Sequence, residues 1–238
     1  MLKLTKPTWR INDAVELCSF NLQHARLGMI KANVRKMSGK DYAYRSELLN
    51  STDSLLGYDE FSLVSKNVGM MSDLRMAADD SLRKKGFGIG ELLRLVSIMQ
   101  LLKNHMNNID LYSLPEAIYF HSKYKFVPNI TRFSERNSLL ETIAEDKASD
   151  FESFHEQANM ALDRIKLFKT SEKQRSFCKS ANILGQKYIE EVFYKGRDEY
   201  ENHSFKCGMD MTLTKFNIIK NKSFFDNKFK SNGIDFEI

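Results

Sequence analysis

The sequence predicts an α/β fold, and the segment between Asn67 and Pro128 carries the observations that favour this class. The pattern there runs strand, glycine-rich stretch, helix, short strand, second helix and further strand. Pro115 opens the second helix at a position where proline is tolerated. The first helix is indicated by apolar residues that recur at helical spacing, namely Leu92, Leu93, Val96, Met99, Leu102 and Met106.

Composition sets the limits of this prediction. The 238 residues are 42% hydrophobic and 28% charged, a soluble globular profile with room for one large domain or one domain with a long insertion. No apolar run is long enough to span a bilayer, and the first ten residues lack the apolar stretch of a signal peptide, so we expect a cytoplasmic protein. The odd, widely spaced cysteines Cys18, Cys178 and Cys207 argue against a disulfide framework and a cysteine zinc site.

The first third of the chain mixes helical and strand signals. Residues 2–5 read as a short strand, and apolar residues at helical spacing over 11–36 predict one broken helix or two helices. Residues 41–49 and 58–66 are strand candidates joined by a turn-prone segment. Residues 67–77 read as a further strand because apolar and charged residues alternate along their second half.

The glycine-rich stretch carries the strongest functional signal. Gly86, Gly88 and Gly90 stand at every second position behind the basic triplet 83–85. Without Cβ atoms, backbone can approach a ligand closely, and the start of the next helix presents unpaired N–H groups that attract an anion. A Walker-type nucleotide loop is excluded because no GxxxxGK[ST] is present, and GFGIGE breaks GxGxxG at its last position.

Arg83-Lys84-Lys85-Gly86-Phe87-Gly88 follows the pattern R/Q-x-x-G-x-G/A and in this respect resembles the GNAT acyltransferase superfamily. In that family a strand precedes the loop and a long helix follows it, and then come a strand and a helix similar to A-x-x-[LF]-Y-x-K-x-G-F. The matching residues here are Ala117, Phe120, Lys123 and Phe126. Residues 205–215 resemble the last strand of the family, which pairs beside the strand that starts near Phe126.

The resemblance implies a GNAT-like mixed, mostly antiparallel twisted sheet flanked by helices. It divides the chain into a core at 1–133, a helical insertion at 134–202, and a closing strand with a C-terminal tail at 203–238. Three stretches of the insertion carry helical periodicity, at 134–146, 150–168 and 171–196. We expect the insertion to narrow the substrate cleft or recruit a protein partner, with a passive structural role as the alternative.

The resemblance also implies a site. The pyrophosphate of an acyl-coenzyme A would lie over residues 84–90. On the strand before the loop, the backbone of Met76 and Ala78 would face the acyl and pantetheine groups. The complete set of implied coenzyme A residues is Met76, Ala78, Arg83, Lys84, Lys85, Gly86, Phe87, Gly88, Ile89 and Gly90.

Two positions depart from the family pattern, because His121 replaces the tyrosine that in many members protonates the departing thiolate and Lys125 replaces a glycine. His121 could act as the acid, since imidazole titrates near neutrality, or it could be a surface histidine. Tyr124 would act as the acid instead if the alignment with the family pattern were shifted. Asp73 is near where some relatives carry a catalytic carboxylate, with a solvated strand aspartate as the alternative.

The resemblance therefore implies an N-acyltransferase that moves an acetyl or other acyl group from acetyl-coenzyme A to an amine, on a small molecule or a protein. We expect no metal and no membrane partner. A module that keeps the fold and binds coenzyme A or a protein without chemistry is the first alternative. A nucleic-acid binder is the second, supported only by the lysine-rich residues 215–233, and the mild formal charge of +5 is weak evidence for it.

Overall fold

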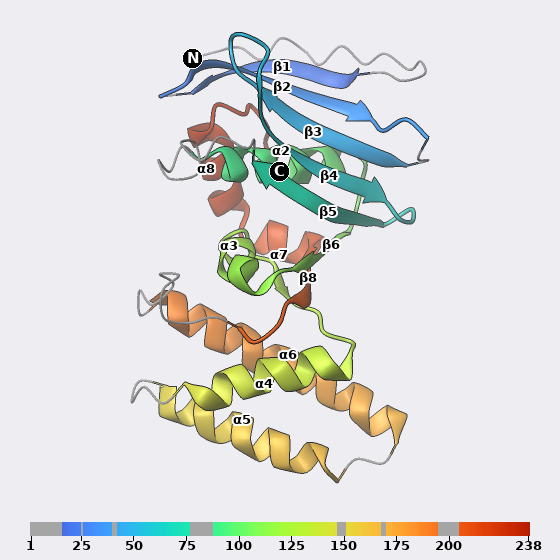
Figure 1. Ribbon diagram of the computed structural model, residues 1–238, viewed down its shortest axis with the longest axis vertical. Coiled ribbons are helices and arrows are strands. Elements are labelled where there is room, and N and C mark those ends of the chain that lie inside the picture. The colour runs from blue at the N-terminus through green and yellow to red at the C-terminus, as the bar shows by residue number, and fades with distance from the viewer. Residues whose placement is uncertain are drawn as a thin grey trace. The chain divides into compact units, whose positions relative to one another are not determined.

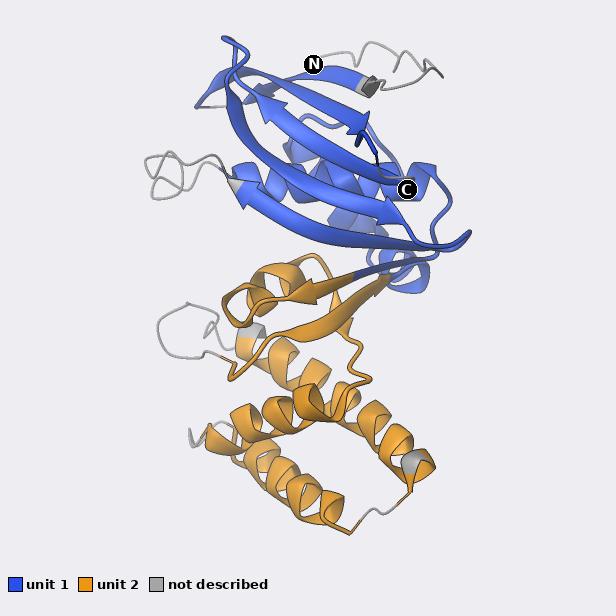
Figure 2. Cartoon of the chain, turned by 45° about the vertical axis from the view of Figure 1, so that its right-hand side comes forward, with its two compact units in different colours: residues 1–110, 214–238 blue, residues 111–213 orange. Residues whose placement is uncertain are grey.

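The computed structural model divides the chain into two compact units, shown in two colours in Figure 2. Unit 1 consists of Met1–Asp110 with Thr214–Ile238, and unit 2 consists of Leu111–Leu213. The structure describes residues 16–24, 26–39, 42–76, 88–146, 151–167, 170–194 and 205–238.

The described strands form one eight-stranded sheet with the order β1-β2-β3-β4-β5-β6-β8-β7 (Figure 1). Neighbouring strands run antiparallel from β1 to β5, and β7 runs antiparallel to β8, so the predicted mostly antiparallel sheet is confirmed. The strands are β1 Glu16–His24, β2 Gly28–Lys36, β3 Ala43–Leu49, β4 Leu55–Leu63, β5 Val68–Met76, β6 Asn108–Ser113, β7 Val127–Pro128 and β8 Met209–Thr214. The helices are α2 Ile89–Lys103, η1 Pro115–Ala117, α3 Ile118–Lys123, α4 Phe133–Glu145, α5 Glu152–Ile165, α6 Ser171–Tyr194, α7 Lys215–Lys220 and α8 Lys222–Ser231.

The helical prediction for residues 11–36 is wrong, because β1 and β2 form an antiparallel hairpin there. Spacing of two residues also produces i, i+4 apolar pairs, so an alternating strand can imitate one face of a helix. Gly28 has a φ of +72° in the turn, a conformation that glycine adopts without strain. The buried residues of the hairpin lie two apart on each strand, namely Phe20 and Leu22 on β1 and Ile30, Ala32 and Val34 on β2. The expected strand at 2–5 lies outside the described residues.

The strands predicted at 41–49, 58–66 and 67–77 are confirmed as β3, β4 and β5. Strand β4 begins at Leu55, three residues before the predicted start, because the turn before it is shorter than expected. The Asn50 side chain closes that turn by accepting hydrogen bonds from the backbone N–H groups of Thr52 and Ser54.

Helices cover one face of the sheet of unit 1, behind the strands in Figure 2. Helix α2 is buried over almost its whole length, including its polar residues Arg94, Ser97 and Gln100. The C-terminal segment is not the polar tail expected from the sequence, because it forms α7 and α8 and buries Phe225 and Phe229 completely. Because they are buried, these two rings cannot stack on the bases of a single-stranded nucleic acid.

Unit 2 contains the three helices expected within residues 134–202, present as α4, α5 and α6. Their core includes Phe151 and Tyr188, whose rings meet edge to face at 5.5 Å. The Tyr188 hydroxyl donates a hydrogen bond of 2.9 Å to the Asp146 carboxylate. Gly185 lets α6 approach α4 closely, since a Cβ atom there would lie 2.6 Å from Leu139.

The closing strand of the fold follows the sequence prediction. β8 is extended and pairs with β7, with Val127 opposite Thr212 and Pro128 opposite Met211. The Asn129 N–H extends this pairing by donating to the Asp210 carbonyl at 2.8 Å. The expected pairing of residues 205–215 with the strand near Phe126 is therefore confirmed.

Candidate functional site

The start of α2 is the first part of the candidate site. Gly88 is the N-cap residue, with φ 71° and ψ 16° in the left-handed region, and no side chain of a described residue caps the helix there. A Cβ atom added to Gly88 would meet no described atom within 4 Å, so the backbone is open on that side. The first turn of an α-helix has unpaired N–H groups and the positive end of the helix dipole, an arrangement that suits an anion.

The remaining residues of the implied coenzyme A site divide into two groups. Met76 is the last residue of β5 and pairs with Gly57 of β4, while Ile89 is buried and Gly90 is half-buried at the start of α2. Burial of the Ile89 side chain leaves its backbone as the part that could contact a ligand. The residues Ala78, Arg83, Lys84, Lys85, Gly86 and Phe87 lie outside the described residues.

The end of α3 explains how Lys125 occupies a position that the family pattern gives to glycine. Lys125 has a φ of +65°, in the left-handed region where glycine is preferred. Its N–H donates to the Ser122 carbonyl at 2.9 Å, and the Phe126 N–H donates to the His121 carbonyl at 3.3 Å. These two bonds form a Schellman motif, so the backbone keeps the glycine-type ending of the helix although the residue is lysine.

His121 is buried, with 6% of its surface exposed, so the alternative of a surface histidine is wrong. Its ring lies edge to face against Phe120 at 5.2 Å and against Phe126 at 5.9 Å, and these apolar neighbours exclude water from it. Tyr124 is also buried and packs against Phe120 at 5.3 Å. Phe120 thus lies next to both candidate acids.

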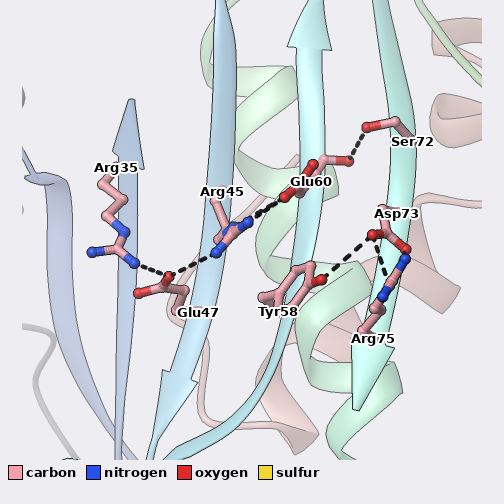
Figure 3. A network of polar contacts seen from close by, with 8 residues as sticks. All are labelled: Arg35, Arg45, Glu47, Tyr58, Glu60, Ser72, Asp73 and Arg75. Carbon is pink, nitrogen blue, oxygen red and sulfur yellow. Dashed lines mark hydrogen bonds and ion pairs between the residues drawn. The ribbon is translucent and has the colours of Figure 1, made fainter. Parts of the chain in front are cut away.

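Asp73 belongs to a polar network on the sheet of unit 1 (Figure 3). The Arg75 side chain approaches its carboxylate at 2.9 Å, and the Tyr58 hydroxyl lies 3.5 Å from it. About a third of the Asp73 side chain is exposed, so it is a half-solvated, ion-paired aspartate. Asp73 lies in unit 1, whereas His121 and Tyr124 lie in unit 2.

The same network continues across β4, β3 and β2 with alternating charge. Glu60 pairs with Arg45, Arg45 lies 3.8 Å from Glu47, and Glu47 pairs with Arg35 (Figure 3). The Arg45 guanidinium also stacks over the Tyr58 ring at 4.3 Å. Each carboxylate is opposed by a guanidinium on a neighbouring strand or on its own strand, so the ladder carries little net charge.

A buried ion pair on the helical face of the same sheet is not apparent from the sequence. The Arg94 guanidinium of α2 lies 3.3 Å from the Asp59 carboxylate of β4, with side chains 4% and 0% exposed. Burial raises the pKa of Asp59 to about 6, although the Arg94 charge and the Ser97 hydroxyl act in the opposite direction. The signal that could have found it is a charged residue at an inward position of an alternating strand, between Tyr58 and Glu60.

Among the residues that the structure describes, no group of three or more His, Cys, Asp or Glu side chains could hold a metal ion. In the same part of the chain, no helix combines the length and hydropathy needed to span a bilayer.

No protein-family model and no curated protein sequence matches the chain. Part of the chain is similar to parts of solved structures. Ard1 from Thermoplasma volcanium is 20% identical over 36% of this chain and 56% of its own, with a TM-score of 0.32. A GNAT family acetyltransferase from Elizabethkingia anophelis with acetyl-CoA bound is 14% identical over 38% and 57%, with a TM-score of 0.32. Nourseothricin acetyltransferase is 15% identical over 53% and 82%, with a TM-score of 0.33.

The chain thus spans little more than half the length of the first two of these structures. TM-scores of this size describe a partial likeness.

Proposed function

We propose that the protein is a GNAT-type N-acyltransferase that transfers an acetyl or other acyl group from acetyl-coenzyme A to an amine. The observation that carries this proposal is the start of α2. The loop pattern Arg83–Gly88 ends at Gly88, the N-cap residue, which is left-handed and open to approach. A pyrophosphate over Gly88, Ile89 and Gly90 would meet backbone N–H groups and the helix dipole together.

Two further features support the proposal. The glycine-like backbone at Lys125 preserves the helix ending that the family pattern implies, in a chain that lacks the glycine itself. Strand β8 pairs antiparallel with β7, as the family pattern implies for its last strand. Both features lie outside the coenzyme A loop, so they support the proposed fold family independently of the loop pattern.

The proposed chemistry assigns roles to the chain's own groups. A neutral amine attacks the thioester carbonyl, a base or a water chain accepts the proton that the amine loses, and the carbon–sulfur bond then breaks to release the thiolate. Backbone N–H groups near Met76 and Ala78 would stabilise the oxyanion, and His121 would donate a proton to the thiolate. Asp73 is the weaker candidate because Arg75 already pairs with it. It would act as a base toward the incoming amine.

Replacing His121 by asparagine should lower turnover about 100-fold, because asparagine keeps a polar side chain of similar size but cannot donate a titrating proton. The measurement is thiol release from acetyl-coenzyme A with a panel of amines, from pH 6 to 9. Coenzyme A affinity should stay within about twofold of the parent, since a proton donor acts in the transition state.

Tyr124→Phe is the matched variant, because it keeps a buried ring and removes only the hydroxyl. If turnover falls in Tyr124→Phe and is unchanged in His121→Asn, the acid is Tyr124 and the proposed role of His121 is wrong. If both variants retain the parent's turnover and pH profile, neither side chain is the acid.

Burial of His121 between phenylalanine rings also favours a second candidate function, a coenzyme A-binding or protein-interaction module without catalysis. Such a module would show a higher melting temperature with coenzyme A and no thiol release with any amine. The two measurements together separate the enzyme from the binding module.

We further propose that the helical segment 134–202 contributes to recognition of the acceptor or of a protein partner. Hydrogen bonds tie it to the residues that flank it, from the Asp210 N–H of β8 to Glu135, from the Ile130 N–H to Asn182 and from the Lys206 N–H to Thr142. This attachment would hold the helices in a fixed position beside β7 and β8.

Exchange of residues 134–202 for a short glycine-serine linker should leave coenzyme A binding intact and abolish use of the preferred acceptor. Calorimetry with coenzyme A and thiol release with the amine panel are the two measurements. Equal acceptor use by the parent and the shortened chain would show that the segment has no role in recognition.

A further inference from the structure

A buried arginine in unit 2 has no carboxylate partner in the described part of the chain. Arg136 lies in the second turn of α4 and is 3% exposed. Its Nε and Nη2 atoms donate to the Asn137 amide oxygen at 3.1 and 2.8 Å. Its Nη1 atom is buried and meets no hydrogen-bond acceptor among the described residues.

Among the described residues, two aromatic rings lie near the guanidinium. Its central carbon lies 5.0 Å from the Phe133 ring and 5.8 Å from the Phe177 ring of α6. The neighbouring acid, Glu135, instead engages Arg132 at 3.0 Å and the backbone N–H of Asp210 at 3.3 Å. Ring faces attract a cation only weakly, whereas a buried charge normally has a paired counter-charge.

We propose that Arg136 is the anchor of an oxyanion-binding site between α4 and α6, for a carboxylate or phosphate group of a ligand. An anion at Nη1 would supply both the missing acceptor and the missing negative charge, in a charge-assisted hydrogen bond. Phe133 is 41% exposed, so its ring can swing toward solvent and admit the anion. Lys173, one helical turn before Phe177 on α6, is exposed and adds positive charge on the same helix face.

The site differs in chemistry and place from the proposed coenzyme A loop, and it does not depend on acyl transfer. Its test therefore uses simple anions and no coenzyme A. Thermal unfolding of the full chain is followed with increasing sodium acetate or sodium phosphate, against sodium chloride at equal ionic strength. The midpoint should rise saturably with at least one anion, by about 3–6 °C at roughly tenfold above its Kd.

Arg136→Met keeps the length of the side chain and removes the charge, and Arg175→Met removes an exposed charge from α6. The saturable rise should vanish in Arg136→Met and persist in Arg175→Met. An equal rise in the parent and Arg136→Met would overturn the proposal, since the anion would then act elsewhere. No rise with either anion would overturn it as well.

A second measurement on the unaltered protein covers the case in which Arg136→Met fails to fold. The side-chain Nε–H resonance of Arg136 should shift saturably with the effective anion and should not shift with chloride. A resonance that stays fixed while the melting midpoint rises would place the anion at another site and overturn the proposal. Acetate and phosphate, titrated separately, distinguish a carboxylate site from a phosphate site.

Discussion

Replacing Gly88 by leucine is expected to weaken coenzyme A binding about 100-fold or more while the fold is retained. The leucine side chain would fill the open space at the start of α2, where the pyrophosphate is proposed to lie. Loss of two charge-assisted hydrogen bonds to backbone N–H groups, at about 1.5–3 kcal/mol each, corresponds to this loss of affinity. Isothermal titration with coenzyme A measures it.

Gly39→Leu is the matched control for that change. Gly39 has a φ of +73° and open space around it, close to the values at Gly88, but it lies in the turn after β2. Both variants should therefore carry a similar backbone strain of about 1–2 kcal/mol and melt at similar temperatures. The pyrophosphate lies elsewhere if Gly88→Leu binds coenzyme A as tightly as Gly39→Leu does.

Replacing Arg94 by leucine is expected to lower the free energy of unfolding by about 3–5 kcal/mol, the largest stability effect that the described ion pairs predict. The change would leave the Asp59 carboxylate buried without its counter-charge. Chemical denaturation at pH 7 measures the loss. Arg75→Leu is the control, because the Arg75–Asp73 pair is exposed and its removal should cost at most about 1 kcal/mol.

The Asp59–Arg94 pair also predicts that the free energy of unfolding depends on pH. The sign of this dependence follows from the direction of the pKa shift of Asp59. The pKa of Asp59 is raised from 3.8 to about 6 in the folded protein, so folding favours the protonated carboxyl. The stability that this group contributes is present in full below pH 3.8 and is lost as the pH rises through about 6. A pKa difference of this size corresponds to about 3 kcal/mol of unfolding free energy.

Asp59→Asn should remove this part of the pH dependence, since the amide does not titrate. The difference in unfolding free energy between parent and variant should change by about 2 kcal/mol between pH 4 and 7, and then level off. A constant difference across this range would show that Asp59 titrates at its ordinary pKa in the folded state.

The sequence was most informative where structure depends on local rules. Helix α2 and strand β6 were predictable from periodicity, and the pairing of β8 with β7 followed from the family resemblance. The hairpin of β1 and β2 was not predicted, because spacing of two residues contains the four-residue spacing of a helix. Helices α7 and α8 were overlooked, because many lysines mask the apolar positions Ile218, Phe225 and Phe229.

The candidate site likewise has one feature that depends on local rules and others that depend on packing between elements. The open helix start at Gly88 depends on glycine conformation and was predictable from residue type alone. Burial of His121 depends on the Phe120 and Phe126 rings and could not be read from its position on a short helix. The Asp59–Arg94 pair requires the register of β4 and its packing against α2, and periodicity alone provides neither.

The place of α8 in unit 1 has a consequence for synthesis on the ribosome. Residues from both ends of the chain complete unit 1, with Lys228 of α8 bonded to Glu91 at 2.8 Å and Gly233 close to Leu22. Leu111–Leu213 must be translated between these two parts, which adds about 5–20 s at ordinary elongation rates. During that time the apolar face of the first strands lacks part of its cover, so a nascent chain stalled before Thr214 should depend on chaperones.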